Sequence, residues 1–89
     1  MEPKQIGAVP CEHYAERQWH AVARSIARNA ALSVDRAAYM KRKARQHGFA
    51  VVALAERYAV AIAQAEAANP DRCRAFIDDE AERIVRGMQ

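Results

Sequence analysis

The chain has 89 residues, a formal net charge of +3 at pH 7 and two cysteines. This length fits one domain and leaves little room for an enclosed active site, so we expect a single domain over residues 11–89 that is not an enzyme. No apolar run follows Lys4 as a secretory signal would require, and we therefore expect Cys11 and Cys73 to be reduced thiols of a cytoplasmic protein.

The first helix is predicted over 12–32. Residues 1–10 contain two prolines and a glycine without any helical or strand period, and we expect them to form a flexible N-terminal arm. After this arm, apolar or small residues recur at steps of three or four positions, as on one face of a helix. Trp19, Val22 and Ile26 are the bulky members of that face.

Two breaks are predicted after this helix, although the apolar stripe stays in phase across both of them. Ser33 can cap a second helix over 34–47, with Asp35 complementing the positive end of its dipole. Gly48 follows a basic turn and is typical of a left-handed C-terminal stop. The alternative is a helix that continues through Gly48 at a cost of about 1 kcal/mol relative to alanine, which would give three helices.

A third helix is predicted over 49–68, a segment with nine alanines. Glu56 and Arg57 lie near its middle, where each charge would cost about 2.5–3.5 kcal/mol in a bilayer, so we expect no membrane span. We expect a buried central helix with two contact faces, and Phe49 is assigned to the core. The alternative for this segment is the contact of a homodimer. The first face consists of Val51, Leu54, Ala55, Tyr58, Ile62 and Ala65, and the second of Val52, Ala59 and Ala63.

A fourth helix is predicted over 70–87. Asn69 provides an N-cap and Pro70 suits the first helical turn, so the start of this helix is well marked. Glu80 lies on its apolar face, where it either pairs with Arg57 if it is buried or reaches water at the edge of the face. The acids around it are expected to be solvated, with contact to a basic partner as the alternative; they are Asp78, Asp79 and Glu82.

Charge is distributed unevenly along the chain. From Arg17 to Ala55 there are eight basic residues and one acid, a local net charge of +7, and the remainder sums to −4. This segregation creates a field that attracts an acidic partner, although the same cations could serve only solubility. We predict a binding surface with Leu32 and Tyr39 as apolar anchors beside the cations. The cations are Arg17, Arg24, Arg28, Arg36, Lys41, Arg42, Lys43 and Arg45.

No set of residues points to a metal, a cofactor or catalysis. Cys11, His13 and His20 lie within ten residues, but they do not make a closed tetrahedral set, and we expect both histidines to lie on the surface. Three glycines provide no phosphate-binding loop. Ala44 and Gly48 have the spacing of a helix-turn-helix, but the segment that follows is apolar where base-reading side chains should project.

The sequence thus predicts a compact all-α bundle of three or four helices that acts by binding. The leading hypothesis is a non-catalytic adaptor, or a stoichiometric inhibitor or regulator, that docks its basic face on an acidic protein surface. Arginine outnumbers lysine eleven to three and alanine reaches twenty-one, a usage typical of GC-rich bacterial genomes and of their phages and plasmids. The alternatives are nucleic-acid binding through phosphate contacts with the same face, and a self-associating structural protein.

Overall fold

The computed structural model describes residues 16–88, which form four helices and no strand. The helices are α1 (Glu16–Ala31), α2 (Arg36–His47), α3 (Phe49–Ala68) and α4 (Arg74–Arg86). The predicted all-α bundle is confirmed, with four helices rather than three. The predicted arm over 1–10 and the start of the first helix lie outside the described residues.

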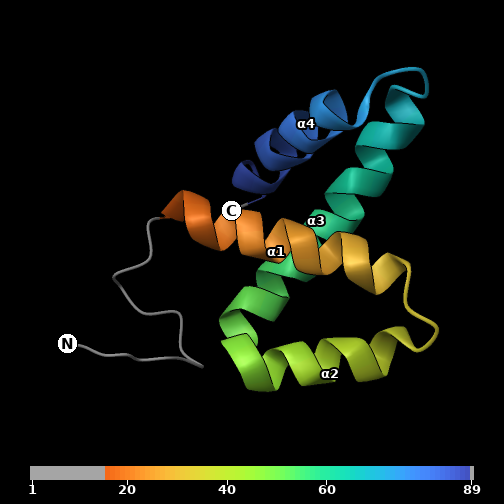
Figure 1. Cartoon of the computed structure of the whole chain (residues 1–89). Coiled ribbons are helices and arrows are strands. Elements are labelled where there is room, and N and C mark those ends of the chain that lie inside the picture. The colour runs from red at the N-terminus through yellow and green to blue at the C-terminus, as the bar shows by residue number, and fades with distance from the viewer. Residues whose placement is uncertain (1–15, 89) are drawn as a thin grey trace.

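The central element is α3, which packs against each of the other three helices. In Figure 1, α1 crosses the middle of α3, α2 lies across its N-terminal end, and α4 lies beside its C-terminal half. The first predicted face of α3 is buried at Val51, Ala55, Tyr58, Ile62 and Ala65. A central helix therefore forms where the sequence predicts one.

The second predicted face of α3 is covered in part. Val52 and Ala59 are partly buried and pack against the core, whereas Ala63 is exposed. The side of α3 that carries Phe49 and Val60 is open. Phe49 is 82% exposed and Val60 is 50% exposed, so the assignment of Phe49 to the core is wrong. The reason is size, because three short helices cannot surround a fourth helix of 20 residues.

The N-terminus of α2 is capped by Asp35 and not by Ser33. The Asp35 carboxylate accepts a hydrogen bond of 3.1 Å from the backbone N–H of Ala38. The Ser33 hydroxyl instead donates to the carbonyl of Asn29 at the end of α1. The second helix therefore begins at Arg36, two residues later than predicted, because the serine is bound to the preceding helix.

Gly48 separates α2 from α3 as predicted. Its N–H donates to the carbonyl of Ala44 over 2.8 Å and closes the last turn of α2. Its dihedral angles, φ 96° and ψ 159°, lie in a region of backbone space that is essentially restricted to glycine. The chain changes direction at this single residue, which excludes the three-helix alternative.

The connection between α3 and α4 differs from the prediction. Asn69 is the C-cap of α3, where its side-chain amide and its backbone N–H both donate to the carbonyl of Ala65. Pro70 then prevents the helix from continuing, a common arrangement just after a C-cap. The fourth helix begins at Arg74, with Cys73 as its N-cap residue. Asn69 and Pro70 therefore end one helix and do not start the next.

A buried polar pair, His20 and Tyr58, joins α1 to α3. His20 is only 7% exposed, so the prediction of a surface histidine is wrong. Its Nδ1 lies 2.6 Å from the Tyr58 hydroxyl, and the two rings meet edge to face with centroids 5.6 Å apart. Burial, with the charge of Glu82 as a smaller cause, raises the pKa of Tyr58 to about 12. The phenol is therefore held in its protonated form.

We predict that Gly48→Ala destabilises the protein by about 1–3 kcal/mol, because alanine has to adopt the positive φ of this position. The matched control is Gly87→Ala. Gly87 has φ −86° and its added Cβ would meet only backbone oxygens at ordinary contact distance, so this change should be neutral or slightly stabilising. Urea unfolding followed by circular dichroism measures both, and equal losses for the two variants would contradict the prediction.

We predict that Tyr58 makes stability fall in alkali. The tyrosine ionises near pH 10 in the unfolded state but only near pH 12 in the folded state. Its contribution to the free energy of unfolding is therefore fully present below pH 10 and is lost as the pH rises through about 12. Tyr58→Phe should cost about 1–3 kcal/mol at neutral pH, because it leaves His20 without this hydrogen bond. The gap in unfolding free energy between wild type and variant should narrow from pH 10 to 12. A constant gap would contradict the prediction.

Candidate docking surface

The cations of α1 are bound by acids of α4. The Arg28 guanidinium donates to a single Asp78 carboxylate oxygen through both Nε, over 3.1 Å, and Nη2. The Nε of Arg24 lies 3.9 Å from Oδ2 of Asp78, and its Nη1 lies 3.6 Å from Oε1 of Glu82. These four side chains are only 20–32% exposed. The prediction that Asp78 and Glu82 are solvated is therefore wrong.

These ion pairs explain how α1 tolerates two arginines four residues apart. Like charges at this spacing repel each other by a few tenths of a kcal/mol. The carboxylates that offset the repulsion come from a helix about fifty residues further along the chain. Arg24 and Arg28 thus hold α1 to α4 and contribute less free positive charge than the sequence indicates. Arg17 lies in the first turn of α1, and its side chain lies outside the described residues.

Arg36 is also paired. Its guanidinium donates to the Glu56 carboxylate over 2.9 Å and connects the start of α2 to the middle of α3. Both side chains are about half exposed, with relative accessibilities of 48% and 50%. Water screens such a pair strongly, so it contributes little to stability and can open easily.

The outward side of α2 carries three cations without a carboxylate partner. Lys41, Arg42 and Arg45 are exposed, and none of them forms an ion pair with a carboxylate of the described chain. We call these three side chains the basic face of α2. Only Met40 of this helix is fully buried, so α2 lies at the edge of the bundle with one side toward solvent.

The inner edge of α2 holds the remaining polar groups. Lys43 is half-buried and donates to the Gln46 side chain over 3.0 Å. Arg42 and Lys43 both lie over the Tyr39 ring, 5.2 and 5.4 Å from its centre, at a distance suited to cation–π attraction. Desolvation and the nearby charge of Lys43 lower the pKa of His47, which disfavours a charged imidazole at this position.

Apolar side chains are exposed at both ends of the basic face. Leu32 is 84% exposed and Val34 is fully exposed in the turn before α2, and Phe49 is exposed just after it. Tyr39, in contrast, is half-buried and packs against the core, so it is less available as an anchor than Leu32. Sequence reasoning missed Val34 and Phe49. Their positions beside the helix boundaries at Asp35 and Gly48 were the available signal.

Glu80 pairs with its own helix and not with Arg57. Its carboxylate accepts two hydrogen bonds from Arg83, over 3.0 and 2.8 Å, and this contact lowers the pKa of Glu80. Arg57 is exposed on the open side of α3. Of the two predicted alternatives for Glu80, the structure therefore shows the second, a side chain at the edge of the apolar face.

Other kinds of site are not evident in residues 16–88. No group of three metal-ligating side chains comes together there, and Cys11 and His13 lie outside this range. None of the helices described has the length and apolar character needed to cross a bilayer. No protein-family model, curated protein or solved structure matches this chain.

We predict that the Arg28–Asp78 pair stabilises the fold by about 1 kcal/mol in a double-mutant cycle of Arg28→Gln and Asp78→Asn, because both groups are three-quarters buried or more. The matched cycle is Arg36→Gln with Glu56→Gln, whose half-exposed groups should couple by only about 0.2–0.5 kcal/mol. Urea unfolding at low and high salt measures both energies. Equal coupling in the two cycles would contradict the prediction.

Proposed function

We propose that this protein is a non-catalytic binding protein that docks the basic face of α2 on an acidic surface of a partner protein. One observation carries the proposal: Lys41, Arg42 and Arg45 are exposed at the edge of the bundle, and no carboxylate of residues 16–88 forms an ion pair with them. Free cations on one side of a helix raise the rate at which an acidic surface is met and orient the encounter.

The apolar neighbours favour a protein over a nucleic acid as the partner. Charge at the edge of an interface mainly affects the association rate, whereas affinity depends on apolar or aromatic anchors near its centre. Leu32, Val34 and Phe49 provide such groups next to the cations. Phosphate contacts would use cations alone, and three of the eight predicted cations are already held by carboxylates.

An adaptor or a stoichiometric inhibitor fits these properties. Both act by covering part of a partner, and neither needs a catalytic centre. The exposed and unpaired thiol of Cys73 suits a reducing compartment, so we place the protein in the cytoplasm.

We predict that Lys41→Glu and Arg45→Glu each reduce capture of the partner several-fold and that the double change abolishes it. The matched control is Arg57→Glu, which causes the same change in net charge on the open side of α3. Quantitative mass spectrometry of affinity captures from the source cells identifies proteins whose recovery falls with the first two variants and not with the control. Lys41→Glu also places an acid four residues before Arg45, which favours the helix, so the fold should be retained.

The same variants separate the proposal from its alternatives. Equal recovery of all captured proteins by the α2 variants and by Arg57→Glu would overturn the proposal. Retardation of random DNA or RNA in a gel at about 50 mM salt, lost at about 200 mM and in the α2 variants, would show nucleic-acid binding in its place. A dimer mass by light scattering with no captured protein would favour self-association.

A further inference from the structure

A groove of about 760 Å³ opens between the C-terminal half of α1, the C-terminal half of α3 and the start of α4. Its volume lies in the range of binding pockets, and it is larger than the gaps that ordinary side-chain packing leaves. Leu32 and Arg36 lie at the end of the groove nearest α2. The groove is therefore next to the docking surface described above.

The walls of the groove are lined mainly by small side chains. Ala27 and Ala31 lie one turn apart on α1, and Ala59 and Ala63 lie one turn apart on α3. Residues without long side chains let the backbone of a second helix approach closely. Ile62, together with the exposed Leu32, supplies bulkier apolar surface. An apolar helical face can therefore lie against these walls.

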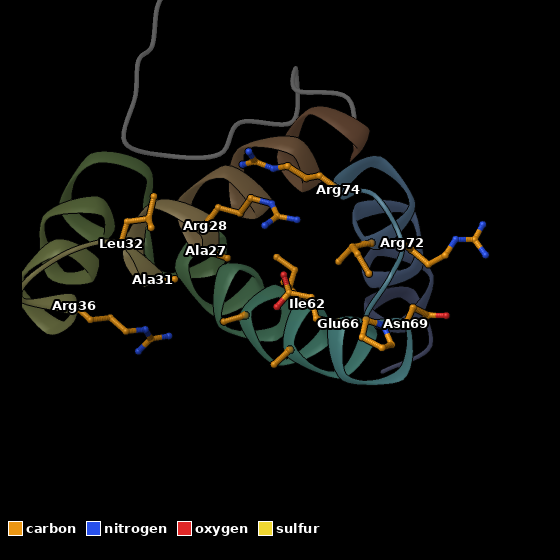
Figure 2. A pocket seen from close by; sticks show the side chains of 14 residues that line it. Ala27, Arg28, Ala31, Leu32, Arg36, Ile62, Glu66, Asn69, Arg72 and Arg74 are labelled. Atoms are coloured by element: carbon orange, nitrogen blue, oxygen red, sulfur yellow. The ribbon is translucent and has the colours of Figure 1, made fainter.

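The charged groups around the groove are mostly positive. Arg28, Arg36 and Arg74 line it, together with Arg72, which stacks on the Phe76 ring and points away from the hollow in Figure 2. Glu66 is the one acid in its lining, and it is exposed. Four cations and one acid line the groove, and Asp78 and Glu56 offset Arg28 and Arg36, so the local net charge is +1. The balance is positive, and an occupant that carries carboxylates is favoured.

The arginines still have hydrogen-bond donors to offer. A guanidinium has five N–H groups, of which Arg28 uses its Nε and one Nη for Asp78, and Arg36 uses one Nη for Glu56. Arg74 has no ion pair in the described part of the chain. Each can bind a further carboxylate without leaving its present partner.

We infer that this groove binds an acidic amphipathic helix of the partner protein. The inference rests on the proposed function and specifies which element of the partner is recognised. The apolar face of the helix lies on the alanine walls, and its carboxylates face Arg28, Arg36 and Arg74, as in other complexes where a helix occupies a groove. The small walls favour a helix, and the unused guanidinium N–H groups of the three arginines favour acids.

The probe is a synthetic fluorescein-labelled peptide of about 18 residues, with leucines at helical spacing and glutamates elsewhere. Fluorescence anisotropy at low salt measures its binding. Ala63→Glu places a carboxylate on the groove wall and should weaken binding at least about tenfold, since like charges are brought together. The matched control, Ala53→Glu, makes the same change on the open side of α3 and should stay within about twofold. Arg74→Glu should likewise weaken binding at least about tenfold, and its control Arg57→Glu should stay within about twofold.

A scrambled peptide of the same composition, whose leucines share no helical face, should bind at least about tenfold more weakly. Equal binding of the two peptides, or equal effects of Ala63→Glu and Ala53→Glu in variants with native circular dichroism, would overturn the inference. If partner capture is lost in the Lys41→Glu and Arg45→Glu double variant but peptide binding is unaffected by Ala63→Glu, the proposed function stands and the groove is not its site. If Ala63→Glu abolishes peptide binding but the α2 variants capture the partner as well as the control does, the groove is retained and the proposed function is removed.

Discussion

The ion pairs between α1 and α4 determine which positive charges this protein can offer to another molecule. Asp78 holds Arg28 and lies close to Arg24, and Glu82 lies on the other side of Arg24. By occupying these two arginines, the acids join the first and last helices and take Arg24 and Arg28 out of the exposed basic surface. The cations of α2 keep their charge because no carboxylate of the described residues pairs with Lys41, Arg42 or Arg45.

Helical periodicity predicted the all-α fold and most of the core, because burial on one face repeats every three or four residues. The number of helices rested on the breaks at Ser33 and Gly48, because the apolar stripe stays in phase across both. The sequence prediction failed at helix ends, where two residues could provide the same cap or one residue could cap either of two helices. Ser33 and Asp35 are both good N-caps, and Asn69 can end one helix or start another. Which of them is used depends on the backbone groups that are free nearby, and a linear pattern does not show those.

The candidate site was harder to predict than the fold, because its character depends on contacts between distant parts of the chain. The sequence showed eight cations in one segment, but it could not show that acids fifty residues away bind two of them. The His20–Tyr58 pair was hidden for the same reason, since the packing of α3 on α1 brings it together. The basic cluster of α2 was visible because its free charge is a local property of the sequence.

In the proposed function, two arginines have different tasks, one stabilising the bundle and the other binding the partner. Arg28 is 20% exposed and makes two hydrogen bonds to Asp78, so separating this pair would weaken the contact between α1 and α4. Arg36 makes one hydrogen bond to Glu56 at a half-exposed position, where the pair stabilises the fold by well under about 1 kcal/mol. In the proposed complex, a carboxylate of the partner can bind the unused N–H groups of Arg36 beside Glu56, and loss of the Glu56 contact would cost the fold little. Since Arg36 lies at the start of α2 and also lines the groove, it is the residue at which the two surfaces would meet the same partner.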